Sequence, residues 1–213
     1  MCFHSKQTKS AQEVENRYKV TIIELELFQP AAAINAFNFT KTPIITDENP
    51  TIIQHYNWGL IPSWAKDEEI KKVTLNARIE TIEDKPSFRD SVNKRCLIIA
   101  NGFYEWQWLD TKGKNKIKYE IGIGNDQLFA FAGIYSQWTN KTTGEIKNTY
   151  AMVTTEANEL MAEIHNIKKR MPIILKPEDE INWLNHQNIQ NFALPYQVNL
   201  VATKTHPDIV SLW

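Results

Sequence analysis

The sequence predicts an α+β protein with a single domain over residues 2–213, in which a mainly antiparallel, barrel-like β core carries a few flanking helices. The length of 213 residues suits one domain with a sizeable core. Aromatic residues make up 11% of the chain while glycines number only seven, a composition that suits a compact β-rich core and argues against glycine-rich nucleotide loops. About six to eight short strand-like segments and two to four helical ones favour α+β.

The strand candidates are short alternating or apolar runs. Near the start of the chain, Val20–Phe28 fits a strand or an amphipathic helix, and residues 30–50, which contain three prolines, fit a loop around one short strand. The stronger candidates follow in order: Ile52–Trp58, Arg95–Ile99, Phe103–Trp108, Lys116–Ile123, Leu128–Trp138, Thr149–Thr154 and the short Ile173–Leu175. Asn101-Gly102 is a turn signal before the third of these.

Three segments have helical character. Residues 5–17 are polar and fit a helix or a loop. The segment Ala157–His165 has an apolar stripe at helical spacing, and Thr155 is its expected cap. A third helix is expected over 177–185, because Pro177 suits a first helical turn.

The composition excludes several classes of function. A formal net charge of −1 excludes a globally basic nucleic-acid-binding coat, so any DNA or RNA surface must be a local patch. Two cysteines, Cys2 and Cys96, are too few for a disulfide framework or a four-cysteine zinc site, and neither a CxxC nor an HExxH motif occurs. We therefore expect no metal and no other cofactor.

The opening residues contain no apolar core of a signal peptide, and no apolar run is long enough for a transmembrane helix. We expect no membrane partner, a cytoplasmic protein with reduced thiols, and a monomer that associates with the nucleoid when it binds DNA.

Cys2 is the first residue with distinctive chemistry. Removal of Met1 would expose an α-amine and a thiol on one residue. Such a 1,2-aminothiol condenses with an aldehyde, first as a Schiff base and then as a five-membered thiazolidine. With an amine pKa of about 7.7–8.0, roughly a tenth of the amine is unprotonated at neutral pH. The alternative is that Cys2 is an incidental residue in a frayed terminus.

Four other residues are candidates for acid–base or anion-binding roles. Glu105 lies between two aromatic residues, which predicts a raised pKa and an acid–base role; the alternative is a solvent-facing strand glutamate. His165 ends the predicted helix, whose dipole would favour the protonated imidazole; the alternative is a capping histidine. Asn76 and Arg78 share one face of an extended segment and suit phosphate or substrate contacts, or ordinary edge-strand polarity.

Two further segments suit a DNA surface. The turn from Trp58 through Pro62 to Trp64 places two aromatic residues where they could stack on unpaired bases, or close a core. The run Lys168-Lys169-Arg170 is a local basic patch or a solvated charge run. Cys96 lies in an apolar run and is expected to be a small core residue.

Taken together and in order, these segments resemble one protein family. Cys2 is followed by the blocks WGLIPSWAK, NARIET, RCLIIANGFYEW, FAGIYSQW, TTEAN and IHNIKKRMPIIL. This order resembles the SRAP family, the SOS-response-associated peptidases, also described as abasic-site processing proteins. The resemblance extends from residue 2 to about residue 185.

The resemblance implies a function and a set of roles. Members of the family act on abasic sites in single-stranded DNA, with junctions to double-stranded DNA as a candidate setting. By motif, Cys2 looks like the nucleophile of a thiazolidine crosslink, and Asn76 like the residue that orients it. Glu105 looks like the acid–base group, and His165 like the partner on the sugar and phosphate side, for strand-cleaving elimination or crosslink reversal. Self-removal of Met1 would account for the peptidase label.

The implied DNA contacts are Arg78, on phosphate, and the apolar turn as a wedge against neighbouring bases. A basic cleft is expected from Lys66, Lys71, Lys72, Arg78, Lys168, Lys169 and Arg170. The sequence departs from the family pattern at three places. Phe3-His4 stand where Gly-Arg is usual, so His4 is expected to contact phosphate weakly or only when protonated. Four residues separate His165 from Arg170 where the family often has one, and Asn35-Ala36-Phe37-Asn38 replaces an Asn-x-x-Pro block.

Two other functions remain open from the sequence. In an N-terminal-nucleophile hydrolase, the Cys2 thiol would attack a carbonyl with its own amine as base. In a non-covalent single-stranded DNA-binding module, aromatic platforms alone would hold the DNA.

Overall fold

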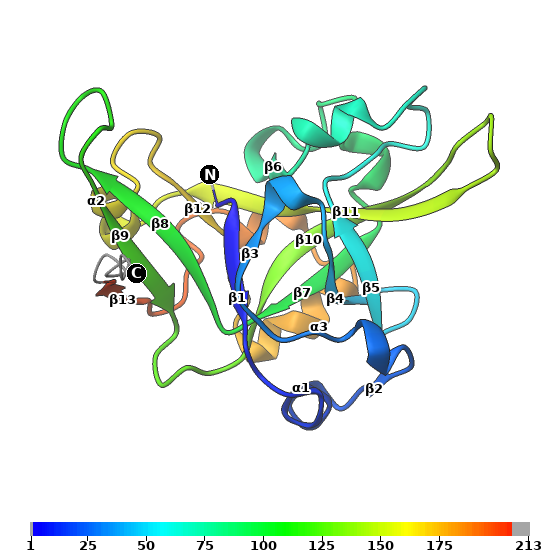
Figure 1. Ribbon diagram of the computed structural model, residues 1–213, viewed down its shortest axis with the longest axis horizontal. Coiled ribbons are helices and arrows are strands. Elements are labelled where there is room, and N and C mark those ends of the chain that lie inside the picture. Colours follow the sequence, from blue (N-terminus) through cyan, green and yellow to red (C-terminus); the bar gives the residue numbers. More distant parts are fainter. Residues whose placement is uncertain (1, 206–213) are drawn as a thin grey trace, which may run out of the picture.

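The computed structural model describes residues 2–205 (Figure 1). Its strands are β1 (His4–Gln7), β2 (Thr21–Ile22), β3 (Ala31–Asn35), β4 (Lys41–Thr46), β5 (Ile52–Trp58), β6 (Asn76–Arg78), β7 (Arg95–Ala100), β8 (Gly102–Trp108), β9 (Lys116–Gly122), β10 (Phe129–Thr139), β11 (Ile146–Glu156), β12 (Arg170–Pro172) and β13 (Val201–Lys204). The α-helices are α1 (Ala11–Tyr18), α2 (Glu159–Ile164) and α3 (Glu180–Leu184), and short 3-10 turns connect several elements.

Five strands close into a barrel. The sheet runs β11-β10-β7-β4-β5, and β5 pairs again with β11, so that the ring closes. The closing pair is parallel, with Trp58 opposite Tyr150, whereas the other four pairings are antiparallel. Strands β12 and β6 extend the barrel from β11, and β2 extends it from β5.

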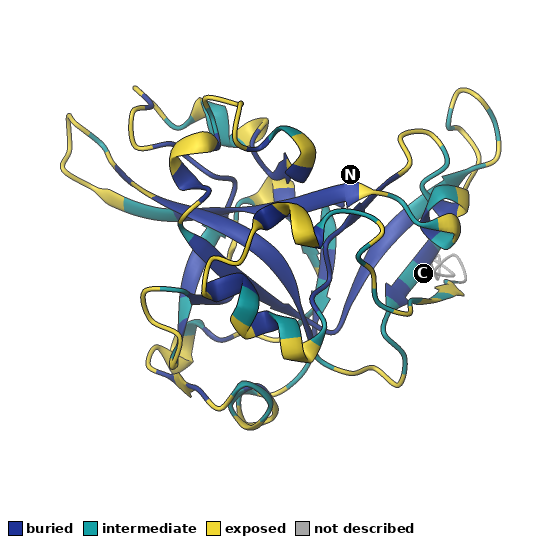
Figure 2. Ribbon diagram, turned by 180° about the vertical axis from the view of Figure 1, so that it is seen from behind, coloured by how far each residue is buried: buried dark blue, intermediate teal, exposed yellow. Residues whose placement is uncertain are grey.

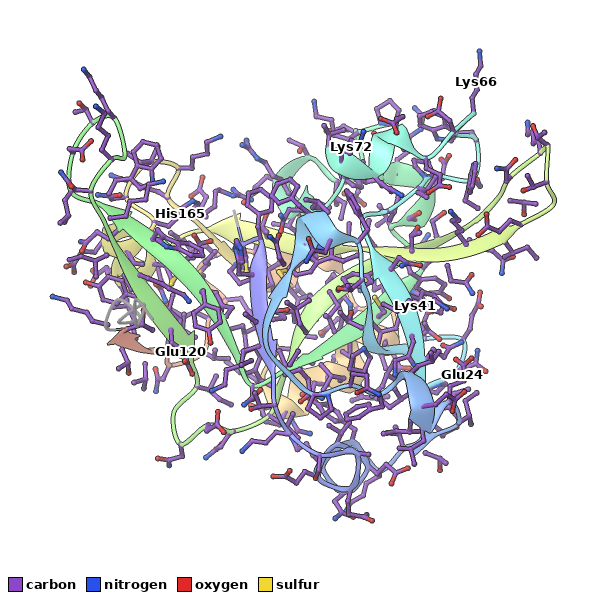
Figure 3. The ribbon with its side chains drawn as sticks, viewed as in Figure 1. Glu24, Lys41, Lys66, Lys72, Glu120 and His165 are labelled. Carbon is purple, nitrogen blue, oxygen red and sulfur yellow. The ribbon has the colours of Figure 1, made fainter. Side chains whose placement is uncertain are left out.

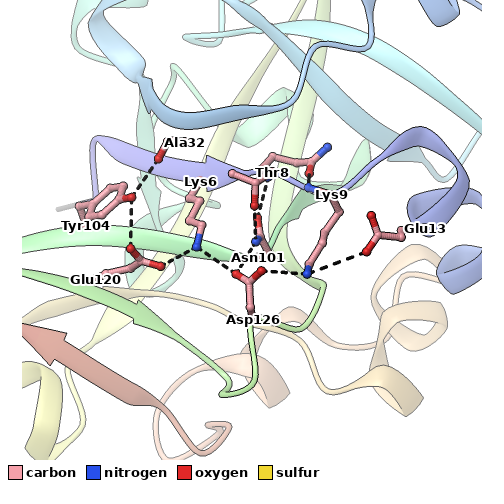
Figure 4. Close-up of polar contacts among 10 residues, drawn as sticks. Lys6, Thr8, Lys9, Glu13, Ala32, Asn101, Tyr104, Glu120 and Asp126 are labelled. Carbon is pink, nitrogen blue, oxygen red and sulfur yellow. Dashed lines mark hydrogen bonds and ion pairs between the residues drawn. The ribbon is translucent and has the colours of Figure 1, made fainter. Parts of the chain in front are cut away.

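A second sheet, in the order β13-β9-β8-β1-β3, stands beside the barrel and contains the first strand of the chain. Strand β1 begins between β8 and β3, where the N-terminus is marked in Figure 1. An ionic network anchors its other end (Figure 4): Lys6 Nζ lies 2.6 Å from Glu120 and 2.9 Å from Asp126, and Lys9 Nζ lies 2.8 Å from Asp126. Burial raises the pKa of Asp126, but the lysines and Asn101 outweigh burial and hold that pKa at about 2.

Alternating strand residues form two large apolar cores. On β7, Leu97 and Ile99 pack in a core that includes residues of α1 and α3. Cys96 and Ile98 pack in the other core, called the inner core below, which reaches the second sheet and includes Cys2. The strands are accordingly the most buried part of the molecule, and the exposed residues gather in the loops and on the outer helix faces (Figure 2). No helix in the described part of the chain is long and apolar enough to cross a membrane.

The predicted fold class is confirmed, and so are most of the strands over 52–58 and 95–154, although the described chain has more strands than expected. Residues 30–50 form two strands rather than one, and in Val20–Phe28 only two residues are extended before a 3-10 turn. The last predicted strand, over 173–175, was wrong: β12 covers Arg170–Pro172, and Ile174 forms only an isolated bridge with Phe131. The expected extent of the domain to residue 213, and the removal of Met1, concern positions outside the described residues.

The expected cap of α2 was wrong. Asn158 caps the helix, with its side-chain oxygen accepting from the backbone N–H of Met161 at 2.9 Å. Thr155 belongs to β11, and its hydroxyl accepts a hydrogen bond from the backbone N–H of Leu194.

Candidate active site

Cys2 lies at the edge of the inner core, just before β1. Its side chain is buried, and its thiol donates a weak hydrogen bond to the carbonyl of His4, 3.5 Å away. Burial raises the pKa of the thiol, and the nearby Glu105 carboxyl raises it further. The thiol is therefore held as S–H at neutral pH, which makes it a poor first nucleophile in this environment.

Asn76 holds the backbone of Cys2. It begins β6, which is fixed by parallel pairing with β11, and its side-chain N–H₂ donates to the carbonyl of Cys2 at 2.9 Å. Its Oδ1 atom is buried and has no hydrogen-bond partner among residues 2–205. Because a buried amide oxygen without a partner is costly, this atom is suited to accept a hydrogen bond from a bound ligand.

Glu105 is a buried carboxyl in the middle of β8. It is only 5% exposed, and burial raises its pKa to about 7, against the effect of a hydrogen bond from the backbone of Trp106. The strand alternation expected from the sequence explains the position: Phe103 on the same face packs in the inner core, so Glu105 points inward as well. A carboxyl with a pKa near 7 can both give and take a proton at neutral pH.

His165 is fixed by its own loop. It ends α2, and its Nδ1 atom accepts from the backbone N–H of Arg170 at 3.1 Å and lies 2.8 Å from the Arg170 carbonyl. The four residues between His165 and Arg170 thus form a loop that closes on the imidazole. The expectation of a protonated imidazole was wrong, because burial lowers the pKa of His165 to about 4.

The site opens into a pocket of about 360 Å³. Its lining includes Phe3, which follows Cys2, together with Glu105 and His165, so that three segments far apart in the sequence share one cavity. The other lining residues are Trp106, Trp108, Lys116, Ile167 and Lys168. Figure 3 shows His165 beside the start of β1, on the opposite side from Lys66 and Lys72.

The predicted basic residues separate into two groups. Arg78, Lys168 and Lys169 are exposed, and in the sequence they lie within four residues of Asn76 or His165. Arg170 is buried, and its guanidinium forms a two-pronged ion pair with Glu80, with distances of 2.9 and 2.8 Å. The expectation that Arg170 contacts DNA therefore conflicts with its burial, and the structure gives it a role in holding the His165 loop.

The lysines expected to line the same cleft do not gather there. Lys71 pairs with Glu68 at 2.7 Å, Lys72 pairs with Glu69, and Lys66 points outward at the far side of the molecule (Figure 3). Two of these lysines are neutralised by ion pairs and the third lies far from the site (Figure 3), so they do not form a continuous basic cleft with the residues around His165.

The predicted aromatic wedge is mostly core. Trp58 is fully buried, its indole N–H donates to the carbonyl of Leu75 at 2.8 Å, and its ring stacks on Tyr150. Pro62 is buried as well, so neither residue presents a face to a base, and only Trp64 is exposed, at 48%. The turn closes the barrel, which is the alternative that the sequence left open.

His4 supports an aromatic residue in place of the expected phosphate contact. Its ring packs edge-on against Trp106 with 4.8 Å between ring centroids, and burial lowers its pKa, as does the nearby Lys118. Its Nδ1 atom is buried without a partner among the described residues. A neutral, half-buried imidazole is poorly suited to bind phosphate.

Trp106 and Trp108 line the pocket although neither was predicted to be a site residue. Both were assigned to a strand, and the alternation that buries Glu105 places them on the opposite face of β8, where they are half-buried and line the pocket. No cluster of acidic, histidine or cysteine residues within residues 2–205 is arranged to hold a metal ion.

The fold and the site define a single-domain β-barrel protein with a cysteine, a carboxyl, an imidazole and an amide gathered at the start of its chain. The model of the SRAP family, described as SOS response associated peptidase, matches residues 1–210, so the chain belongs to this family.

Related proteins are similar over most of the chain. The abasic site processing protein YoqW of Bacillus subtilis is 45% identical over 162 residues, which cover 73% of this chain and 70% of that protein. The abasic site processing protein HMCES of Gallus gallus is 30% identical over 67% of this chain and 48% of its own length. A crystal structure of a protein from Bacteroides thetaiotaomicron matches with a TM-score of 0.86 and 37% identity, covering 97% of this chain and 93% of that chain.

Proposed function

We propose that this protein captures abasic sites in single-stranded DNA as a covalent thiazolidine formed by Cys2, after it has removed its own Met1. The observation that carries the proposal is the pocket that Glu105 and His165 line beside Cys2. The side-chain amide of Asn76 fixes Cys2 there by donating a hydrogen bond to its backbone carbonyl. The names of the related abasic site processing proteins support the choice of DNA substrate.

The proposed chemistry begins at the amine. The opened abasic sugar offers an aldehyde, and the Cys2 amine attacks its carbon to form a carbinolamine. Loss of one water gives an imine, and the thiol then adds across the C=N bond, with sulfur bonding to carbon and the proton ending on nitrogen. An amine-first order follows from the environment of the thiol, whose raised pKa keeps it protonated until the imine has formed.

Glu105 and His165 divide the proton transfers between them. With a pKa of about 7, Glu105 can protonate the leaving hydroxyl of the carbinolamine and later relay the thiol proton to the nitrogen. His165, neutral at pH values well above 4, is assigned the sugar side, as the base for strand-cleaving elimination or crosslink reversal. Removal of Met1 would be a separate hydrolysis that consumes one water and frees the Cys2 amine.

Intact-mass measurement tests the proposal. The protein is mixed with single-stranded DNA that carries one abasic site, and we expect a protein mass without Met1 and an adduct equal to protein plus DNA minus one water. Cys2→Ala should form no stable adduct. Cys96→Ala is the matched control, because Cys96 is also a buried free cysteine but lies in the middle of the chain, on β7, and has no α-amine.

Other outcomes would favour the alternatives. Retention of Met1 with no adduct would contradict the proposal. Turnover of an amide substrate would indicate an N-terminal-nucleophile hydrolase. If the Cys2→Ser variant protected abasic DNA as well as the wild type does, the protein would be a non-covalent binding module.

A further inference from the structure

The pocket that contains Glu105 and His165 extends well beyond these two residues. Strand β1 starts at His4 and pairs with β8 only at Phe103 and Gly102, so β8 runs on past it from Glu105 to Trp108. In this stretch the pocket is walled by Trp106 and Trp108 on β8 and by Phe3 at the start of the chain. The extension is therefore aromatic and continuous with the reactive end.

Neighbouring residues fix the positions of both tryptophan rings. Trp106 packs against the His4 ring at 4.8 Å, and the Lys118 ammonium lies 6.0 Å from its centroid. Gly113 packs directly on Trp108, since a Cβ atom at that position would lie 2.6 Å from the indole ring. Rings that are fixed before binding lose little entropy when a ligand stacks on them.

The loop after α2 completes the pocket. Asn166 fixes this loop to the end of β8, with its Oδ1 accepting from Trp108 N–H at 3.1 Å and its Nδ2 donating to the Trp108 carbonyl at 2.8 Å. The next two residues, Ile167 and Lys168, line the pocket; Ile167 is 51% exposed although it is apolar. The longer loop thus supplies an apolar contact and a positive charge.

The charges at this pocket suit a polyanion. Lys116 lies 4.6 Å from the centroid of the Trp108 ring and lines the pocket, as Lys168 does. Neither ammonium makes an ion pair with a carboxylate among residues 2–205. Aromatic faces next to unpaired lysines match the two parts of a nucleotide, because bases stack on aromatic rings and lysines bind the backbone phosphate.

We propose that this pocket binds the nucleobase directly adjacent to the abasic residue, stacked against Trp106 and Trp108, with the backbone phosphate near Lys116 and Lys168. The inference rests on the proposed function, because it assumes that the reacting sugar lies at Cys2. One neighbouring base would then anchor the DNA, so that the aldehyde is presented to the amine in a fixed register.

Capture kinetics test the pocket. Single-turnover adduct formation is measured at subsaturating protein with three oligonucleotides: one with normal bases on both sides of the abasic site, one with a tetrahydrofuran spacer on the 5′ side, and one with the spacer on the 3′ side. The spacer has no base and no aldehyde. We expect the spacer on one side to slow capture by about tenfold, the size that stacking of one base supplies.

Two pocket variants and one control locate the effect. Trp108→Ala should slow capture of the normal oligonucleotide by about tenfold and abolish the response to the spacer. Ile167→Ala, at an exposed position that leaves the fold intact, should weaken capture in the same direction by a smaller factor. Leu109→Ala is the control, because Leu109 directly follows the same strand, is 60% exposed and does not line the pocket.

A second readout separates the pocket from the covalent chemistry. Affinity is measured by anisotropy with an oligonucleotide in which tetrahydrofuran also replaces the abasic sugar, so that no aldehyde is present. One outcome would overturn the proposed function but retain the base pocket. In it, the aldehyde-free DNA binds with an affinity that depends on the flanking base and on Trp108, while DNA with an aldehyde forms no adduct. Equal capture rates and affinities with all flanking positions, or unchanged spacer sensitivity in Trp108→Ala, would overturn the pocket.

Discussion

The side-chain amide of Asn76 donates a 2.9 Å hydrogen bond to the backbone carbonyl of Cys2, across 74 positions of sequence. This single bond joins the first residues of the chain to strand β6 and thereby to the barrel. It orients the backbone from which both the amine and the thiol of Cys2 project.

Asn76→Ala is expected to slow adduct formation by about tenfold or more, because the backbone of Cys2 loses its buried donor. The rate of capture at fixed DNA concentration is the measurement. Asn57→Ala is a matched control, since Asn57 also donates to a backbone carbonyl, that of Phe39 at 2.7 Å, but lies outside the site. Equal slowing in both variants would mean that Asn76 acts only through general stability.

Glu105 is expected to set the pH dependence of capture. Its pKa is about 7, whereas that of His165 is about 4, so between pH 5 and 8 only the carboxyl of this pair changes its charge. The wild-type rate should therefore change around pH 7, His165→Gln should keep that midpoint, and Glu105→Gln should lose it. A midpoint that survives in Glu105→Gln would assign the titration to another group, such as the Cys2 amine.

The same carboxyl is expected to make the folded protein less stable as the pH rises. The native pKa of about 7 exceeds the reference value of 4.5, so between these values the folded state binds more protons than the unfolded state, and stability falls with increasing pH. Glu105→Gln should remove this decline and raise the free energy of unfolding at pH 8 by at most about 3 kcal/mol. Urea unfolding at pH 5 and pH 8 measures it, and an unchanged decline in the variant would contradict the assignment.

Arg170 is expected to support both the fold and the His165 loop. Arg170→Met leaves the Glu80 carboxylate without its partner and should lower the free energy of unfolding by about 2 kcal/mol, less than for a fully buried pair because Glu80 is 33% exposed. Lys72→Ala serves as the control, since its pair with Glu69 is exposed and should contribute almost nothing. Equal urea midpoints for Arg170→Met and the wild type would contradict a structural role.

Arg78 is expected to contribute to the initial binding of DNA through charge. It is exposed on β6, two residues after Asn76. Arg78→Ala should weaken binding and reduce the slope of log affinity against log salt by about 0.7, the value for one phosphate contact on a single strand. Lys141→Ala, at the exposed tip between β10 and β11, should leave the slope unchanged. Salt-insensitive capture by the wild type would rule out a phosphate contact at this step.

Local patterns in the sequence predicted much of the scaffold. The run Ile52–Trp58 is a strand with the predicted bounds, and the alternation around Glu105 gives the correct face for its side chain. Such patterns are local, because the side chains of a strand point alternately to its two faces. They could not show whether a side chain is exposed to a ligand or packed inside the protein. Trp58 was a candidate for stacking on bases but lies in the core, and Arg170 was a candidate for binding DNA but pairs with Glu80.

The sequence by itself determined the family and the α+β class and supplied the candidates for the chemically active residues, because these depend on residue types in a fixed order. Only the tertiary structure decided their ionisation and their neighbours. The pKa values of Glu105 and His165 move in opposite directions because burial disfavours the charged form of each, and burial arises from contacts between distant segments. For the same reason the aromatic pocket beyond Cys2, built from the first residues, β8 and the loop after α2, exists only in the folded chain.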